Sequence, residues 1–308
     1  MCAAAAILTS SIYNFDQRTV MKVGKNALAE FLYALIVWGA EIVAILRTNR
    51  TMKRLSARQQ EEYNNVTRCY ICRHEFEESE AKGPKVRYHD HITGMLIGAA
   101  HRQCNLERPV SFKIPVFFHN FRGNDAHLIV HEFGKRPDRE IKVIGHNMEK
   151  YLQVEWGKNM VCRDSLQFLP ASLEQLAVSV AKVGRGYFQN LHDIVKDFYP
   201  EADVELHESQ KVFCYDYLDS FTRLYQPALP PREAFFNKLG RVESSQADYA
   251  HAQHVFANFH CQSLKEYMAL YLVSDICLLA DVFQAFQNNS LDESQLDPAY
   301  FVSAQQLA

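Results

Sequence analysis

Four residues have the types and the spacing of a zinc site. Cys69 and Cys72 form a Cys-x-x-Cys pair, and His101 and Cys104 form a His-x-x-Cys pair about 30 residues further on. Zinc prefers four tetrahedral sulfur and nitrogen ligands, and a Cys-x-x-Cys turn places two thiolates on one side of a metal. Such a site keeps no open position, so we expect structural zinc. Two alternatives stay open, namely thiols buried without a metal and a remnant site that has lost it.

A second set of polar residues lies close to these ligands. The sequence YHDH occupies positions 88–91, between the two half-sites, and Asn105 directly follows the last cysteine. A histidine on a strand and an asparagine on the next helix could form a single-metal hydrolytic site. In such a site His89 activates water, and a hard cation stabilises the scissile phosphate. For His91 a structural role fits better than a ligand role.

The string CYIC…VRYHDHITG…GAAHRQCNLER, which runs through all these residues, resembles the His-Me finger nuclease module of recombination endonuclease VII. The resemblance implies that His89 is the general base and that Asn105 binds Mg or Mn. The family pattern has an aspartate where this chain has Tyr88, and a phenol of pKa near 10 is a poor ligand for a hard cation. Asp90 could support the site, but in a strand it faces the opposite side. We therefore expect a structural or DNA-contacting module rather than an active nuclease.

Three further motifs follow in order. IPVFFHNFRGNDAHLIV, at 114–130, resembles the second exonuclease motif of family-B DNA polymerases. CRDSLQFLPASLEQL, at 162–176, resembles the stretch that follows in protein-primed polymerases. YLVSDICLLADVF, at 271–283, resembles the third exonuclease motif. Together with the endonuclease VII-like insert, this order resembles the polymerases of Polinton or Maverick transposons and related viruses.

The resemblance implies two-metal phosphodiester hydrolysis, in which carboxylates hold two cations. Asp125 and Asp275 would be metal ligands, and Tyr271, on the same helical face as Asp275, would position water or the scissile phosphate. Asn120 would support the site. The open alternatives are that Asp125 caps a helix and that Asp275 and Asp281 are exposed helix charges. Because only a remnant at 14–16 (NFD) stands where an upstream Asp-x-Glu is needed, we expect no proofreading activity.

Hydrophobic patterning predicts the elements that position these residues. We expect helices at 25–48, 54–65, 125–133, 172–180 and 263–286. We expect strands at 114–119, 141–144, 151–156 and 160–163, and a proline-rich loop at 225–231. The helix at 172–180 opens with Ser172 and Gln175, a capping-box pair.

These elements predict an α/β protein. The motifs imply a ribonuclease-H-like exonuclease domain, a mixed sheet with flanking helices that is incomplete at its N-terminus, with a small inserted ββα zinc module. We expect an N-terminal helical segment of the exonuclease region at 1–66, the zinc module at 67–110, the exonuclease-type domain at 111–290 and a tail at 291–308.

Composition limits the possible environments and partners. The 308 residues are 48% hydrophobic, enough for a sizeable core, and the net charge of -3 means that nucleic-acid binding needs a local basic patch. The isolated cysteines (Cys2, Cys162, Cys214, Cys261 and Cys277) fit a reducing compartment. Glu30 and Glu41 interrupt the apolar run at 27–46, whereas a membrane span needs about 20 apolar residues, and no positive flank marks a signal peptide. We expect an intracellular protein, nuclear or cytoplasmic, without a membrane partner.

These features predict the N-terminal part of a protein-primed family-B DNA polymerase. It would bind DNA without a complete polymerase site, because the palm aspartates of such enzymes lie well beyond position 308. In an intact relative a terminal or priming protein would be a further partner. Two alternatives stay open. One is a Mg-dependent His-Me finger endonuclease acting through His89 and Asn105, and the other is a non-catalytic, transposon-derived nucleic-acid-binding protein.

Overall fold

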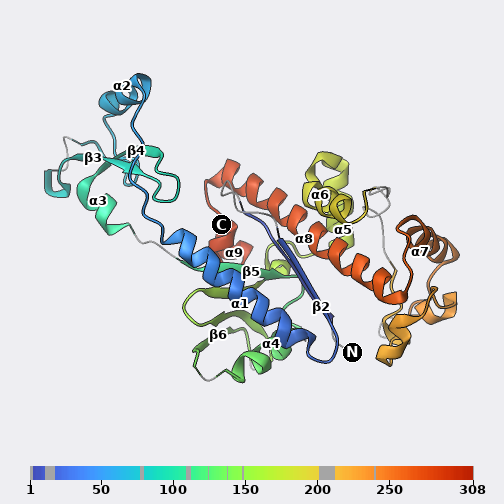
Figure 1. Cartoon of the computed structure of the whole chain (residues 1–308). Coiled ribbons are helices and arrows are strands. Elements are labelled where there is room, and N and C mark those ends of the chain that lie inside the picture. The colour runs from blue at the N-terminus through green and yellow to red at the C-terminus, as the bar shows by residue number, and fades with distance from the viewer. Residues whose placement is uncertain are drawn as a thin grey trace. The chain divides into compact units, whose positions relative to one another are not determined.

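The computed structural model of the chain describes residues 3–10, 18–76, 80–108, 112–123, 125–136, 138–147, 149–200, 212–238 and 241–307. They form two compact units (Figure 1). The larger unit comprises Met1–Leu35 and Pro115–Ala308, and the smaller unit comprises Ile36–Ile114. Both contain helices and small sheets, so the predicted mixed α/β class is confirmed. The exonuclease-motif remnant at 14–16 lies outside the described residues.

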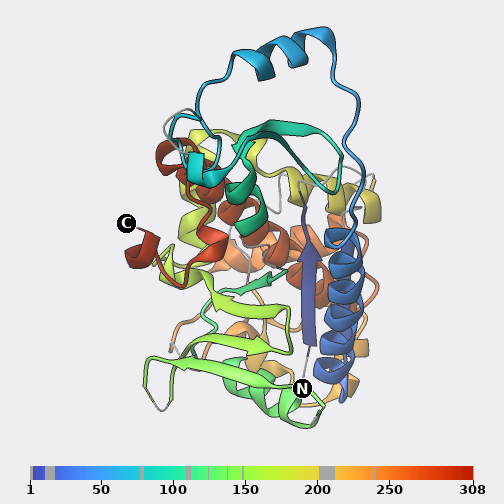
Figure 2. The ribbon, with the colours of Figure 1, turned by 90° about the vertical axis from the view of Figure 1, so that its left-hand side faces the viewer.

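The larger unit contains a β-hairpin and a four-stranded sheet. The hairpin pairs β1 (Ala3–Leu8) with β2 (Arg18–Val23) in antiparallel register. The sheet has the order β5-β8-β7-β6, formed by β5 (Ile114–Phe118), β6 (Ile141–Gly145), β7 (Tyr151–Trp156) and β8 (Met160–Asp164). Strands β6, β7 and β8 form the antiparallel meander drawn in green in Figure 2. All four strands of this sheet were predicted, whereas the hairpin was not.

The larger unit contains several helices, and its main core forms around α8. The helices are α4 (Asp125–Gly134), α5 (Leu173–Val183), α6 (Gln189–Phe198), α7 (Gln246–Asn258), α8 (Leu264–Ser294) and α9 (Ala304–Leu307). Buried residues of α5, α6, α7 and α8 form one cluster, to which the hairpin adds apolar side chains of β1 and β2. The capping box of Ser172 and Gln175 at the start of α5 is present as predicted. Helices α6 and α7 were not predicted.

The smaller unit has the order that the zinc motif implies. Strands β3 (Lys85–His89) and β4 (Leu96–His101) form an antiparallel hairpin, and α3 (Arg102–Glu107) follows at once. Helix α2 (Ala57–Asn65) lies beside β3, because Lys85 donates hydrogen bonds to the carbonyls of Asn64 and Val66, and Arg87 donates to Gln60. The ββα arrangement is therefore observed, and it is preceded by the predicted second helix.

Helix α1 (Ala27–Leu46) belongs to both units, since the division falls at Leu35. Both α1 and α8 are long and apolar enough to cross a membrane by length and composition alone. In the most apolar window of α1, 17% is buried, and in that of α8, 44% is buried. A core helix of a soluble protein passes the same test, so the expectation of no membrane span stays a prediction.

Candidate metal centre

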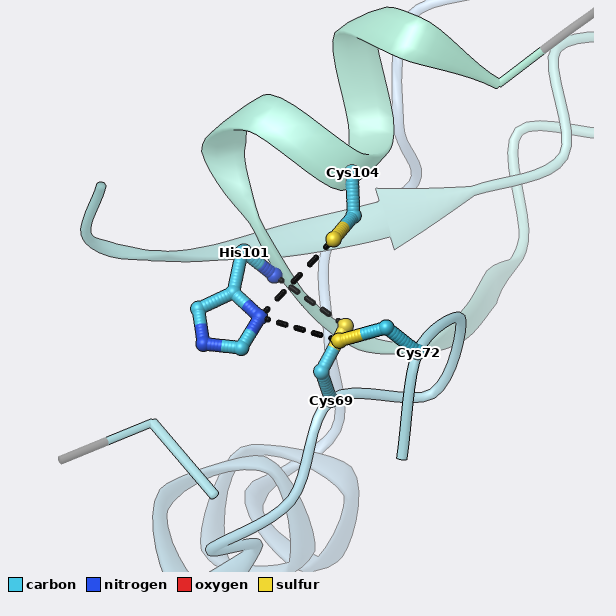
Figure 3. Close-up of side chains that lie close together, drawn as sticks. All are labelled: Cys69, Cys72, His101 and Cys104. Carbon is cyan, nitrogen blue, oxygen red and sulfur yellow. Dashed lines mark hydrogen bonds between the residues drawn. The ribbon is translucent and has the colours of Figure 1, made fainter. Parts of the chain in front are cut away.

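The four predicted zinc ligands converge on one point (Figure 3). The ligand atoms of Cys69, Cys72, His101 and Cys104 all lie within 4.8 Å of one another. Nδ1 of His101 is 3.5 Å from Sγ of Cys72 and 3.9 Å from Sγ of Cys104. A tetrahedral zinc ion with Zn–S near 2.3 Å and Zn–N near 2.0 Å requires S···N distances of about 3.5 Å. The side chains are thus already spaced for such an ion, with Nδ1 as the histidine ligand atom.

The first half-site is a tight turn. The backbone N–H of Cys69 donates to the carbonyl of His74, and that of Arg73 donates back to the carbonyl of Cys69, both at 2.9 Å. Arg73 adopts φ 62°, which reverses the chain. The N–H of Tyr70 donates to the carbonyl of Ala99 at 2.8 Å and ties the turn to β4. The two cysteine sulfurs are therefore held beside the end of β4.

The second half-site lies at the junction of β4 and α3. His101 is the last residue of β4, and Cys104 lies in the first turn of α3. His101 is fully buried, its N–H donates to Sγ of Cys69 at 3.4 Å, and its ring packs 4.9 Å from that of Phe76. Because the helix starts directly after the strand, a single turn brings Cys104 back toward His101.

The three thiols titrate differently. Burial raises the pKa of Cys69 and Cys72, but neighbouring donors outweigh it and lower both, that of Cys72 to about 6. Those donors are backbone groups and the His101 ring for Cys69, and His74 for Cys72. For Cys104, burial and the adjoining thiolates together raise the pKa to about 11. Three thiolates this close repel one another, and a divalent cation bound between them would allow all three to ionise.

This ligand set favours zinc over other chemistry. A Cys-x-x-Cys pair alone also fits a redox site, but the convergence of a histidine and a third cysteine is typical of a structural zinc site. No disulfide joins any of the seven described cysteines. Hard cations such as Mg prefer oxygen ligands, and this set offers none. Bound zinc would hold the turn, β4 and α3 together.

The predicted nuclease residues lie in the same ββα unit, in which Tyr88 belongs to the core. Tyr88 is only 7% exposed and packs with Cys69 and Ala100. A register shift separates Tyr88 from His89, which is half-buried and stacks on His91 with ring centroids 4.8 Å apart. A tyrosine that fills the core of the module is not placed as a metal ligand.

Asp90 and Asn105 complete the predicted nuclease set. Oδ1 of Asp90 accepts hydrogen bonds from the N–H groups of Ile92 at 2.7 Å and Thr93 at 3.4 Å, so its carboxylate stabilises the turn between β3 and β4. Asn105 is half-buried on α3. The catalytic and supporting roles of His89, Asn105 and Asp90 stay predictions.

The predicted exonuclease residues lie in the larger unit. Asn120, with φ 65°, begins the turn 120–123 that follows β5, and Asp125 is the first residue of α4. Asp125 is an exposed residue, but partial desolvation of its carboxylate and the nearby Asp164 carboxylate raise its pKa. On α8, burial and the hydrogen-bonded Asp275 carboxylate raise the pKa of Tyr271, so this pair does share one helical face. Whether these residues bind metal stays a prediction.

The sequence did not reveal the residue that stabilises the turn between β5 and α4. Asp164, at the end of β8, is fully buried and accepts backbone hydrogen bonds from Asn120, Arg122 and Leu166 at 2.9 to 3.1 Å. The guanidinium of Arg122 lies 3.6 Å from the same carboxylate. Two sequence signals could have revealed it: Arg163 and Asp164 form a charged pair at the end of an apolar strand, and both lie in the motif at 162–176.

No second metal centre is formed by the part of the chain that the structure describes. Apart from the Cys/His cluster, no three His, Cys, Asp or Glu ligand atoms converge among these residues. No protein-family model, no curated protein and no solved structure matches the chain, so its own geometry must carry the functional interpretation.

Proposed function

We propose that the chain is a DNA-engaging part of a protein of the protein-primed family-B DNA polymerase type, in which the smaller unit is a zinc-stabilised DNA-contacting module. The chain binds DNA but performs neither polymerisation nor proofreading by itself. One observation carries the proposal, namely the convergence of Cys69, Cys72, His101 and Cys104 on a ββα unit that contains the His89 motif.

The charge distribution supports DNA contact by the smaller unit. Residues 36–114 contain 13 lysines and arginines against 9 aspartates and glutamates, whereas the rest of the chain contains 20 against 27. The smaller unit is therefore net basic, although the chain as a whole has a net charge of -3. Local positive charge favours phosphate contacts and releases counterions when DNA binds.

The larger unit supports the polymerase-type part of the proposal. Its four-stranded sheet contains the predicted strands, and α4 and α8 carry Asp125, Tyr271 and Asp275, the residues that the resemblance to the exonuclease motifs names. We propose a ribonuclease-H-like fold on this basis. Any remaining nuclease activity would use Mg or Mn.

DNA binding tests the proposal directly. We expect fluorescently labelled DNA to bind the zinc-loaded chain at 50 mM salt, and binding to weaken steeply toward 200 mM, by about a factor of ten for each two to three phosphates contacted. A Cys72→Ser, Cys104→Ser double variant should lose most of this binding because its module cannot fold around zinc. Absence of binding by the zinc-loaded wild-type chain at 50 mM salt would overturn the proposal.

A second candidate is a Mg-dependent endonuclease. One observation favours it: His89 follows a bulge at the end of β3 and is only half-buried. A general base must be accessible to the water that it activates. A plasmid-nicking assay with Mg or Mn separates the two functions. Nicking that depends on the metal and disappears in His89→Ala would replace the DNA-contacting function by this one.

A further inference from the structure

Lys82 contacts a ligand of the metal centre from outside. It ends the short 3-10 turn Glu80–Lys82, and its Nζ donates a hydrogen bond to Sγ of Cys72 at 3.6 Å. The side chain is half-buried, so the ammonium is held beside the sulfur and is partly shielded from water. The centre thus has a positive charge directly next to one of its three thiolates.

The negative charge of the zinc-bound centre explains why a contact with Lys82 would stabilise it. Zinc bound by three thiolates and one neutral histidine carries a net negative charge, and burying that charge is unfavourable unless a cation or a donor compensates it. The Lys82 ammonium supplies both. Removing it leaves an anionic complex half-buried among the apolar side chains of Ile71 and Phe76.

The histidine ligand has no such outer partner in the described residues. Metal-bound histidines usually donate their second ring N–H to a carboxylate, a carbonyl or water. Nε2 of the fully buried His101 has no hydrogen-bond partner within the described ranges, and the ring packs on Phe76 instead. Among the described residues, the charged outer contact of this centre is therefore the one between Lys82 and Cys72.

The three sulfurs differ in how burial and hydrogen-bond donors shield them from electrophiles. Sγ of Cys69 is fully buried and accepts the N–H of His101. Sγ of Cys72 accepts from the neutral donors of His74 and from the cationic Lys82. Cys104 is half-buried, and no lysine or arginine of the described chain donates to its sulfur. A thiolate whose lone pair is engaged by a cationic donor is a weaker nucleophile, so Cys104 is left as the most reactive.

We propose that Lys82 is an outer-shell positioning residue of the zinc centre, which stabilises the anionic zinc complex and shields Cys72, so that Cys104 reacts first with electrophiles. The inference rests on the proposed zinc module and assigns a role that the four ligands alone do not define.

Zinc competition with a chromophoric chelator tests the first part, using the full chain. We expect Lys82→Met to weaken zinc binding about tenfold, as is usual for the loss of an outer-shell partner. Lys82→Arg keeps a cationic donor and should stay within about twofold of wild type. The matched control is Lys53→Met, because Lys53 lies in the same unit and is exposed, and among the described residues its one hydrogen bond is from its backbone N–H to Gly94.

Alkylation of the zinc-loaded chain by iodoacetamide, mapped by mass spectrometry, tests the second part. In each event the thiolate sulfur forms a bond to carbon and iodide leaves. We expect Cys104 to react before Cys72 in wild type, and Cys72 to react about five to ten times faster in Lys82→Met, with Cys69 unchanged. A merely structural loss would instead accelerate all three sulfurs together.

The outcomes separate the inference from the proposed function. Equal zinc affinity and equal Cys72 reactivity in Lys82→Met and Lys53→Met would overturn the role of Lys82 alone. Zinc binding without DNA binding would overturn the proposed function. The role of Lys82 would then still be decided by the zinc affinity and the Cys72 reactivity of Lys82→Met. A wild-type chain that binds no zinc would overturn both.

Discussion

Tyr88→Asp introduces the carboxylate that the resemblance to His-Me finger nucleases predicts before His89, yet we expect the substitution to damage the module. Tyr88 is 7% exposed and packs against Cys69 and Ala100, both fully buried. Its ring lies 5.9 Å from that of Tyr70, and the Arg108 guanidinium lies 4.9 Å from its centroid. An aspartate at this position loses all of these contacts.

The size of the effect follows from this environment. Removing a buried aromatic side chain costs about 3–5 kcal/mol, and burying a carboxylate without a partner costs more. We therefore expect Tyr88→Asp to destabilise the β3–β4 hairpin by at least about 4 kcal/mol. Tyr88→Phe is the matched control, since the described residues give the Tyr88 hydroxyl no hydrogen bond. It should stay within about 1 kcal/mol of wild type, as a conservative change of this size does.

Hydrogen exchange of the zinc-loaded chain is the suitable assay, because it measures opening of the hairpin separately from the larger unit. Amides of β3 and β4 should lose protection in Tyr88→Asp and keep it in Tyr88→Phe. A Tyr88→Asp variant that retains full protection and gains Mg-dependent nicking would refute the reasoning, since Tyr88 would then occupy an intact metal site and not the core.

Three further substitutions test the residues that stabilise two turns and the start of α6. Asp164→Ala leaves three partly buried backbone N–H groups and a nearby arginine without their acceptor, and should lower the unfolding free energy by about 3–5 kcal/mol in chemical denaturation; an effect no larger than that of the exposed Asp138→Ala contradicts this. Asp281→Ala removes the acceptor for two N–H groups at the start of α6 and should cost about 2–4 kcal/mol, seen as faster exchange in α6; behaviour equal to that of the exposed Asp292→Ala on the same helix refutes it. Gly94→Ala should cost about 1–3 kcal/mol, because φ is 73° and a Cβ would lie 2.7 Å from a backbone carbonyl oxygen of the linker before α2; unchanged exchange in the β3–β4 turn tells against this strain.

Much of the local structure was predictable because its signals are local. The strands at 114–118, 151–156 and 160–164 and the helix at 125–134 follow from runs of apolar residues with turn signals at their ends. The metal ligands were predictable for the same reason, since two pairs with a spacing of two residues each define half a site. Helix α7 was missed although Ser245 and Asp248 form a capping box that could have revealed it.

Other features depend on contacts that no local pattern contains. Helix α6 begins without a side-chain cap of its own, and its first N–H groups are satisfied by Asp281, about 90 residues away in the sequence. Strand β1 is a run of alanines whose pairing with β2 stabilises it, although alanine has low strand propensity. The contact of Lys82 with Cys72 arises from the path of a 3-10 turn, which sequence spacing does not define.

The four converging side chains should bind one zinc ion, and native mass spectrometry of the full chain measures this binding most directly. We expect one zinc ion per wild-type chain, none in a Cys72→Ser, Cys104→Ser double variant, and one in Cys162→Ala, which removes a buried thiol of the other unit. A zinc-free wild-type chain purified with zinc present, or a double variant that retains the ion, would contradict the account.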